Sequence, residues 1–434
     1  MSSVTSAADP APGPATEPAQ DPALRYVLAV GAVSAGLSLT DISDTGLSSS
    51  VVTEAQARRL ARSWGIEPAG GPGDGPGTVV VLVDGLGLEM LRQRRGHTPT
   101  LRRWLVQGYD GDGSDDSNST GILTCRPSTT AAALTTLGTS ALPGTTGMVG
   151  YSVLRPGLGP ALPASTVPSS AQVLSLITWQ GDDAPSPRSW QDVPTIFERI
   201  TGGSAVSIGP ARFAGSGLTE AALRGAEHRG ADRMEDRPGL AAGALRRGMP
   251  LVYLYVGELD HTGHKHGWRS PQWLAQLERL DAAMAELARR VPAGTRIILS
   301  ADHGMVDTDA DHRIELTDHR ELVRDVVAVA GEPRLTHLHV AGGNADLAAE
   351  VAHRYRQVLG ERAAWIGTRE QAAEHLGALS PRAHGVVGDV VVAMAGTWVL
   401  VDPRVHSEPA IAMPGVHGSF TPAETRVPLL VTEA

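Results

Sequence analysis

The chain has a single cysteine, Cys125, among its 434 residues, so no disulfide can form within it. This cysteine content fits a reducing compartment, and we expect the protein to be cytoplasmic. No apolar run reaches the roughly 20 residues that a membrane helix needs, so we expect no membrane segment. Residues 1–21 lack the basic start and apolar centre of a signal peptide. Because they are rich in Ala, Pro, Ser and Thr, we expect residues 1–24 to form a disordered tail.

Basic residues are also in deficit. The sequence holds 37 Lys and Arg against 47 Asp and Glu, which gives a formal net charge of -10. Proteins that bind nucleic acids usually present a basic surface, so this balance argues against a nucleic-acid surface. Hydrophobic residues make up 41% of the chain, as in ordinary globular proteins, and the length suffices for one large domain or two.

What the sequence does contain is acidic and imidazole side chains at the ends of apolar runs. Leu251–Val256 is typical of a buried strand, and Asp260 and His264 follow it closely. A second apolar run, at residues 296–300, leads directly into Asp302 and His303. Oxygen and nitrogen ligands without thiolates suit hard-to-borderline divalent metals. The two clusters therefore predict metal binding.

Strands and helices alternate along most of the chain. A buried strand is expected at Thr78–Val83, followed by one helix that ends near Val106. Another helix is expected from Thr129, and a third begins at Ser270–Pro271, with serine as N-cap and proline in the first turn. The alternation predicts an α/β fold with a mainly parallel central sheet flanked by helices.

The pattern changes between residues 312 and 403. Short strands at 336–340, 388–395 and 397–401 alternate there with a helix at 345–359. We interpret this stretch as a small inserted α+β subdomain.

Each candidate residue has a simpler interpretation when it is taken alone. An aspartate directly after a strand, such as Asp84, is more often a turn residue or a helix cap. Asp260 and His264 alone would be a helix cap and a surface histidine, and His417 would be a loop histidine. In parallel sheets, however, ligands gather beyond the carboxyl ends of the strands, so the strand-end residues are expected to converge.

The motifs also occur in a defined order. The segments are Asp84, Pro127-Ser128-Thr129-Thr130, Asp260-His261-Thr262-Gly263-His264, Asp302-His303-Gly304 and Gly415-Val416-His417-Gly418. In this order they resemble the alkaline phosphatase superfamily, and most closely its nucleotide pyrophosphatase/phosphodiesterase branch. The resemblance covers most of the chain, and the ordered set is specific although each piece alone is not.

The resemblance implies a threonine nucleophile. In that family it lies in a Pro-Thr-x-Thr segment, thirteen residues before a proline and seventeen before a glycine, and counting back from Pro143 and from Gly147 selects Thr130 in both cases. A threonine hydroxyl is a poor nucleophile at neutral pH, and a divalent metal can hold it as an alkoxide. A helix that starts here also places backbone N–H groups near phosphate oxygens. The implied reaction passes through a covalent phospho-threonine, which water then hydrolyses.

The resemblance further assigns ligands to two divalent metal ions, with Zn2+ expected. One ion would be held by Asp84, Thr130, Asp302 and His303, and the other by Asp260, His264 and His417. Two such ions clamp the attacking and leaving oxygens of in-line phosphoryl transfer. The implied protein is a two-metal hydrolase of phosphodiester or phosphoric anhydride bonds in a small-molecule phosphate ester. Its implied fold is alkaline phosphatase-like, with residues 25–434 as the catalytic domain and 312–403 as the probable insertion.

Three positions depart from the family pattern. Tyr151 stands where the family has an asparagine that holds a phosphoryl oxygen, and Thr146 replaces a histidine. Ala131 replaces an aromatic residue that helps to stack a nucleobase. A nucleotide preference therefore does not follow from the resemblance. Tyr151 can bind a phosphoryl oxygen through its hydroxyl, line the leaving-group pocket, or simply pack in the core.

The same residues bear on several other functions. A phosphomonoesterase or phosphomutase of the same superfamily needs additional cationic groups, and Arg126 is a candidate. A sulfatase needs a Cys-x-Pro-x-Arg segment, which begins at Cys125 but ends in Thr129 instead of arginine, so we reject that function. A catalytically degenerate binding protein would keep the fold, and the complete set of ligands argues against it.

Overall fold

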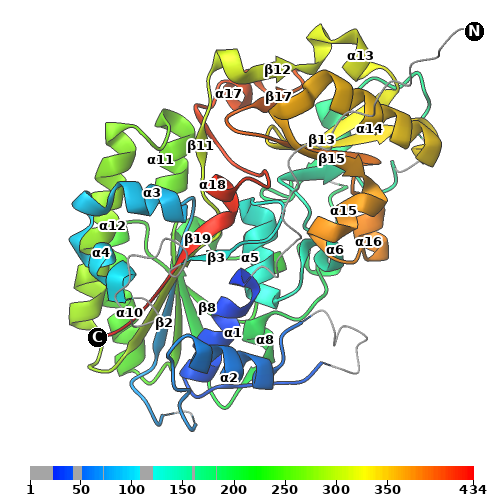
Figure 1. Ribbon diagram of the computed structural model, residues 1–434. Helices are drawn as coiled ribbons and strands as arrows, with labels where there is room; N and C mark the ends of the chain where they lie inside the picture. Colours follow the sequence, from blue (N-terminus) through cyan, green and yellow to red (C-terminus); the bar gives the residue numbers. More distant parts are fainter. Residues whose placement is uncertain (1–22, 43–50, 72, 108–120, 159–161, 182) are drawn as a thin grey trace, which may run out of the picture.

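The structure is a computed structural model that describes residues 23–42, 51–71, 73–107, 121–158, 162–181 and 183–434. Apart from Ala23 and Leu24, the predicted tail at residues 1–24 lies outside the described residues. The described chain forms a large central sheet between helices and a second, smaller sheet at one end (Figure 1).

The central sheet has seven strands in the order β3-β19-β10-β2-β9-β7-β8. Five of them run parallel, and their bounds are β10 (Arg296–Ala301), β2 (Thr78–Val83), β9 (Leu251–Val256), β7 (Ala205–Gly209) and β8 (Glu227–Gly230). β19 (Arg426–Glu433) is antiparallel to β10, and β3 (Gly121–Leu123) is antiparallel to β19. The predicted α/β fold with a mainly parallel sheet is confirmed.

Both faces of this sheet are buried, as parallel sheets require. In β2, Val79, Val81 and Val83 pack into one hydrophobic cluster, whereas Val80 and Leu82 pack into another on the opposite face. The first cluster includes residues of α4 (Pro99–Gln107), α10 (Arg237–Arg246) and α12 (Pro271–Arg290). The second includes residues of α1 (Leu24–Ser34), α2 (Glu54–Ser63) and α5 (Thr130–Thr139). Figure 1 shows α10 and α12 on one side of the sheet and α1 and α5 on the other.

The single helix predicted after β2 is wrong. Two helices, α3 (Leu88–Gln93) and α4, are separated by a 3-10 turn at Arg95–His97. α3 already ends at Gln93, and α4 begins at Pro99, where the proline disfavours helical geometry in the residue before it. Thr98 accordingly has φ -128° and ψ 67°.

The second sheet is antiparallel and has the order β13-β14-β16-β15. Its strands are β13 (Val326–Glu332), β14 (Leu335–Val340), β16 (Val390–Met394) and β15 (Ala363–Thr368). One face packs on α14 (Ala345–Leu359), a helix with the predicted bounds, and the other packs on residues of the 148–153 segment. β12 (Arg313–Glu315) and β17 (Val399–Val401) form a parallel pair. In the sequence, β12 precedes the first strand of this sheet and β17 follows the last. The bounds 312–403 for an inserted subdomain stay a prediction.

Several further elements of the described chain are short. Those near the strand ends are α11 (Glu258–His266), β11 (Val306–Asp307), β18 (Gly415–Val416), α18 (Pro422–Thr425) and α6 (Pro143–Thr146). The others include β4 (Ser152–Leu154), β5 (Val173–Ser175), α7 (Pro187–Trp190), α8 (Ile196–Arg199), α9 (Gly217–Ala222), α13 (Arg320–Val323), α15 (Arg369–Leu376), α16 (Pro381–His384) and α17 (Glu408–Ile411). β1 (Ser38–Leu39) pairs with β6 (Ile200–Thr201).

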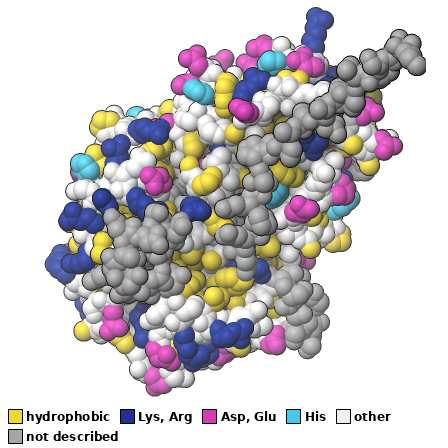
Figure 2. Space-filling model, in the orientation of Figure 1, with side chains coloured by type: hydrophobic (Ala, Val, Ile, Leu, Met, Phe, Trp, Pro, Cys, Tyr) yellow, Lys and Arg dark blue, Asp and Glu magenta, His cyan; other side chains and the backbone are white. Residues whose placement is uncertain are grey.

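Charged side chains of both signs cover the face drawn in Figure 2. Basic side chains gather on its left, over α3, α4 and α12, and acidic ones are spread over the upper part around the second sheet. None of the helices formed by the described residues combines the length and the apolar character needed to cross a lipid bilayer.

Candidate metal centre

The carboxyl ends of β9, β2 and β10 bring the strand-end residues together. These three strands are neighbours in the sheet, and Asp84 directly follows β2 while Asp302 directly follows β10. Asp260 lies in the first turn of α11, just after β9. Two groups result, in each of which the possible ligand atoms lie within 4.8 Å of one another. The groups are Asp84, Asp302 and His303, and Asp260, His264 and His417.

The first group is fully buried and lies beside the predicted nucleophile, Thr130, which is half-buried. The Nε2 atom of His303 lies 3.4 Å from Oδ1 of Asp84 and 3.6 Å from Oδ2 of Asp302. The Oγ1 atom of Thr130 lies 3.1 Å from the same Nε2 atom. All four side chains that were predicted for one metal site are thus neighbours.

The second group converges on one carboxylate oxygen. Oδ1 of Asp260 lies 3.3 Å from Nε2 of His264 and 3.6 Å from Nε2 of His417. The rings of His303 and His417 stack against each other, so the two groups are adjacent. All seven predicted ligand residues therefore lie in one region of the molecule.

The histidines are oriented by the main chain. In His303, Nδ1 lies 3.0 Å from the carbonyl oxygen of Gly304. In His264, Nδ1 lies 2.8 Å from the carbonyl oxygen of Gly415, and in His417 it lies 3.0 Å from that of Ser128. A carbonyl can only accept, so each Nδ1 carries the hydrogen and each Nε2 keeps its lone pair. Metal-binding histidines are commonly fixed in this way.

Two of the carboxylates, Asp302 and Asp84, are also held by hydrogen bonds, each through one oxygen. Oδ1 of Asp302 accepts hydrogen bonds from the backbone N–H groups of Gly85, at 3.1 Å, and His303, at 2.9 Å. The hydroxyl of Tyr255 donates to Oδ2 of Asp84. Three carboxylate oxygens are buried and have no hydrogen-bond partner among the described residues: Asp84 Oδ1, Asp302 Oδ2 and Asp260 Oδ1. Buried polar atoms without partners are costly, and divalent cations would satisfy all three.

The electrostatics lead to the same conclusion. Burial raises the pKa of Asp84 well above its usual value, and the negative charges of Asp302 and Asp260 raise it further. Burial also raises the pKa of Asp260 and of Asp302. The pKa of His417 is lowered well below its usual value, first by burial and then by charge on the neighbouring imidazoles. Neutral imidazoles and ionised carboxylates are the forms that bind metals, and the cations would offset the repulsion between the carboxylates.

The predicted nucleophile opens a helix. Thr130 is the first residue of α5, and Thr129 precedes it in an extended conformation, with φ -135° and ψ 147°. No side chain caps this helix start, so the N–H groups of the first turn keep their hydrogen-bonding capacity. The backbone N–H of Ser128 donates to the carbonyl of Gly418 at 3.2 Å, which joins the nucleophile turn to the segment that carries His417.

The departures from the family pattern have distinct environments. Tyr151 is 47% exposed, so the interpretation that it packs in the core is wrong. Ala131 and Thr146 are buried. An Nη atom of Arg126 lies 3.0 Å from Nδ1 of His375, and its guanidinium lies over the ring of Phe420. The cationic group that a monoesterase would use is thus engaged with other side chains.

Two residues near the centre did not emerge from the sequence. Tyr255 was part of an apolar strand, yet its alternation with Leu254 and Val256 already placed it on one face of β9. Glu332, at the end of β13, gave no local signal because its partners are distant in the sequence. It accepts a hydrogen bond from the backbone N–H of Tyr151 at 2.6 Å.

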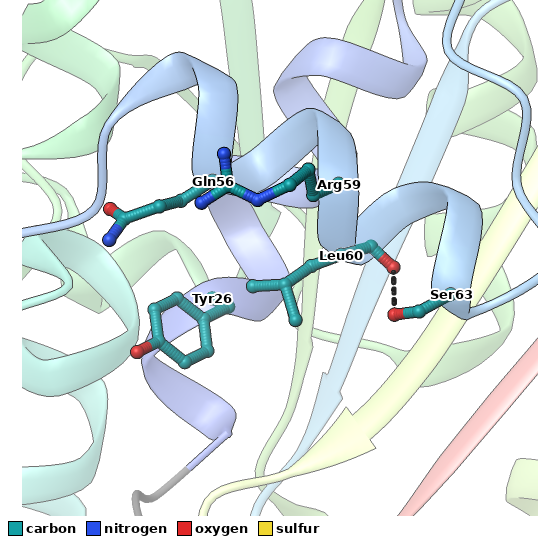
Figure 3. Close-up of a pocket in the computed structure, with 5 residues that line it drawn as sticks. All are labelled: Tyr26, Gln56, Arg59, Leu60 and Ser63. Atoms are coloured by element: carbon teal, nitrogen blue, oxygen red, sulfur yellow. Dashed lines mark hydrogen bonds between the residues drawn. The ribbon is translucent and has the colours of Figure 1, made fainter.

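A surface depression elsewhere lacks these chemical groups. It has a volume of about 360 Å³ and lies between α1 and α2 (Figure 3), lined by Tyr26, Gln56, Arg59, Leu60 and Ser63. Ser63 donates to the carbonyl of Leu60 at 2.9 Å. The depression contains no carboxylate or imidazole, so it cannot hold the predicted metal ligands.

Comparisons with known structures agree on the fold. Murine ectonucleotide pyrophosphatase / phosphodiesterase 5 matches 82% of this chain and 87% of its own, with a TM-score of 0.59 and 16% identity. Phosphonoacetate hydrolase from Sinorhizobium meliloti 1021, in complex with phosphonoformate, matches 82% and 89%, with a TM-score of 0.59 and 18% identity. The predicted alkaline phosphatase-like architecture is confirmed.

Comparisons of sequence identify the family. A segment of 62 residues, 14% of the chain, is 37% identical to the catalytic subunit of GPI ethanolamine phosphate transferase 3 from Homo sapiens. That segment spans 6% of the relative's own length. Residues 78–419 match the model of the family described as type I phosphodiesterase / nucleotide pyrophosphatase, which is more than half of the chain. The chain therefore belongs to the type I phosphodiesterase / nucleotide pyrophosphatase family.

Proposed function

We propose that the protein is a two-metal phosphodiesterase whose nucleophile is Thr130. The observation that carries this proposal is the position of the Thr130 hydroxyl, 3.1 Å from His303 Nε2 and next to two acid–imidazole groups with unsatisfied carboxylate oxygens. One divalent ion would be held by Asp84, Asp302, His303 and Thr130, and the second by Asp260, His264 and His417. When bound, such ions lower the pKa of a coordinated hydroxyl and neutralise charge on the phosphoryl oxygens.

The chain itself positions the reacting groups. Oγ1 of Thr130 gives up its proton to solvent and forms a bond to phosphorus, while the bond from phosphorus to the leaving-group oxygen breaks and that oxygen takes up a proton from solvent. This step gives a phospho-threonine. Water then attacks the same phosphorus and releases Thr130 in its original form. The uncapped first turn of α5 presents N–H groups that suit a phosphoryl oxygen.

The substrate class is a small-molecule phosphate ester. Ala131 stands where the family has an aromatic residue that helps to stack a nucleobase, and its small buried side chain cannot stack in this way. We therefore do not propose a nucleotide preference. Similarity of a short segment to a GPI ethanolamine phosphate transferase is compatible with a diester substrate. A phosphomonoesterase or phosphomutase is less favoured, because Arg126 is engaged with His375 and Phe420. A cytoplasmic location and the identity of the metal as Zn2+ stay predictions.

A pair of chromogenic substrates tests the proposal. We expect the purified chain to hydrolyse bis-p-nitrophenyl phosphate faster than p-nitrophenyl phosphate, and we expect a chelator to abolish both activities and added Zn2+ to restore them. Thr130→Ala serves as the matched inactive control in the same assay. The reverse substrate preference would favour a phosphomonoesterase, and activity on neither substrate would favour a binding protein.

A further inference from the structure

The turn between β13 and β14 reaches from the second sheet to the catalytic residues. At its tip, Arg334 is fully buried and forms two hydrogen bonds with Glu424, at 3.0 and 2.6 Å. Glu424 in turn accepts from the backbone N–H of Ser419 at 3.0 Å. On the other side of the turn, the hydroxyl of Ser152 donates to the carbonyl of Gly331 at 2.9 Å. The turn is therefore docked between the segment after Tyr151 and the segment after His417.

Glu332 occupies this turn and contacts three catalytic segments. One carboxylate oxygen, Oε2, accepts from the backbone N–H of Tyr151 at 2.6 Å. The carboxyl also interacts with the hydroxyl of Thr129, the residue directly before Thr130. It packs against Gly418, directly after His417, where a Cβ atom would lie 2.7 Å from Cγ and 2.8 Å from Oε1 of Glu332.

A carboxyl group is an expensive choice for this location. Glu332 is only 6% exposed, and its Oε1 atom has no hydrogen-bond partner among the described residues. Burial raises its pKa to about 8. An apolar side chain of similar volume would avoid the desolvation cost, but it could accept no hydrogen bond from Tyr151 or Thr129. What the carboxyl adds is a fixed geometry for those two segments.

We propose that Glu332 is a positioning residue of the active site. It fixes two segments, the turn that carries Thr130 and the backbone at Tyr151, relative to the segment that carries His417. The inference rests on the proposed function, because it assumes that Thr130 is the nucleophile. Reactions of this kind are sensitive to small displacements, since a shift of about 1 Å in a reacting group can cost on the order of 100-fold in rate. Glu332 touches neither substrate nor metal in this role.

Two substitutions separate positioning from stability. Glu332→Met fills the same space without an acceptor, and we expect it to fold with an unchanged or raised melting temperature. We expect its kcat for bis-p-nitrophenyl phosphate to fall about 10-fold or more, with a much smaller change in KM and an unchanged metal content. Glu332→Gln keeps a carbonyl acceptor of the same size, and we expect it to recover most of the wild-type kcat.

Asp389→Asn is the matched control. Asp389 is a buried carboxylate of the same sheet that accepts from the backbone N–H of Val340 at 2.8 Å and pairs with Arg369. We expect Asp389→Asn to lower the melting temperature without lowering kcat. A wild-type kcat in Glu332→Met would overturn the inference. A lowered kcat would also overturn it if the metal content of Glu332→Met falls in parallel, or if Glu332→Gln does not recover most of the wild-type kcat. Full activity of Thr130→Ala would instead overturn the proposed function.

Discussion

The imidazole rings of His303 and His417 stack, with their centroids 3.6 Å apart and their planes 16° from parallel. Two protonated rings could not stay this close, and burial lowers the pKa of both groups from the usual value. Nε2 of His303 lies 3.4 Å from Oδ1 of Asp84, and Nε2 of His417 lies 3.6 Å from Oδ1 of Asp260. This pair of residues therefore joins the two acid–imidazole groups into one centre for two cations.

The first prediction concerns metal content. Protein purified without chelator is expected to contain about two divalent ions per chain, by elemental analysis. Asp302→Ala and His417→Ala should each remove most of the activity, because each takes a ligand from one of the two sites. His312→Ala, which changes an imidazole that is 41% exposed and paired with Asp309, is the control and should behave as wild type. Full activity of a metal-free preparation would contradict the mechanism.

The second prediction concerns the nucleophile. Thr130→Ala should leave folding and metal content largely intact and lower turnover on the order of 10³-fold or more, because it removes the hydroxyl that lies 3.1 Å from His303 Nε2. Thr129→Ala should cost far less, since that hydroxyl interacts with Glu332 and is not the predicted nucleophile. Steady-state rates and a trapped phosphoenzyme measured on both variants check this assignment. A larger loss in Thr129→Ala would show that the assignment is wrong by one residue.

Much of the centre could be predicted because its ligands follow their strands directly. Asp84 and Asp302 come immediately after buried runs, and parallel neighbours bring such positions together. The orientation of the histidines could not be predicted, because it depends on carbonyl groups such as that of Ser128, which is remote from His417 in the sequence. The contacts of Glu332 are equally remote. The start of α4 at Pro99, by contrast, has a local cause that is visible in the sequence.

The third prediction concerns pH and stability. His337 is buried on β14, where its Nε2 lies 3.0 Å from the carbonyl of Val149 and its Nδ1 accepts from the N–H of Gly388 at 3.1 Å. A second proton would remove that acceptor, and burial lowers the pKa of this histidine from 6.5 to about 4. Above pH 6.5 the group is neutral in both folded and unfolded chains. Between that pH and about 4 only the unfolded chain binds the proton, so stability falls as the pH falls.

The measurement compares unfolding of wild type and His337→Gln between pH 7 and pH 5. For one proton the free energy of unfolding should change by at most about 1.4 kcal/mol per pH unit, and His337→Gln should show a shallower slope. His312→Gln, at an exposed position, should keep the wild-type slope. Equal slopes in wild type and His337→Gln would mean that this histidine does not titrate as its surroundings imply.

The last prediction concerns Tyr151, which occupies the place of the family's asparagine. Its backbone is held by Glu332 while its side chain is 47% exposed, so the phenol is free to face a bound substrate. An asparagine amide would donate a hydrogen bond to a phosphoryl oxygen, and the longer phenol offers one donor for the same purpose.

If the hydroxyl of Tyr151 makes that contact, Tyr151→Phe should lower turnover of bis-p-nitrophenyl phosphate by about 1–3 kcal/mol in transition-state terms, because a donor to a charged oxygen is lost. Metal content should not change. Tyr151→Asn restores the family's donor and should retain more activity than Tyr151→Phe, although its shorter side chain leaves space at the rim. Wild-type kinetics in Tyr151→Phe would show that the hydroxyl has no part in binding the phosphoryl group. In that case only the ring of Tyr151 would contribute to substrate binding. Tyr151→Ala should then raise KM for the aromatic diester while leaving kcat almost unchanged.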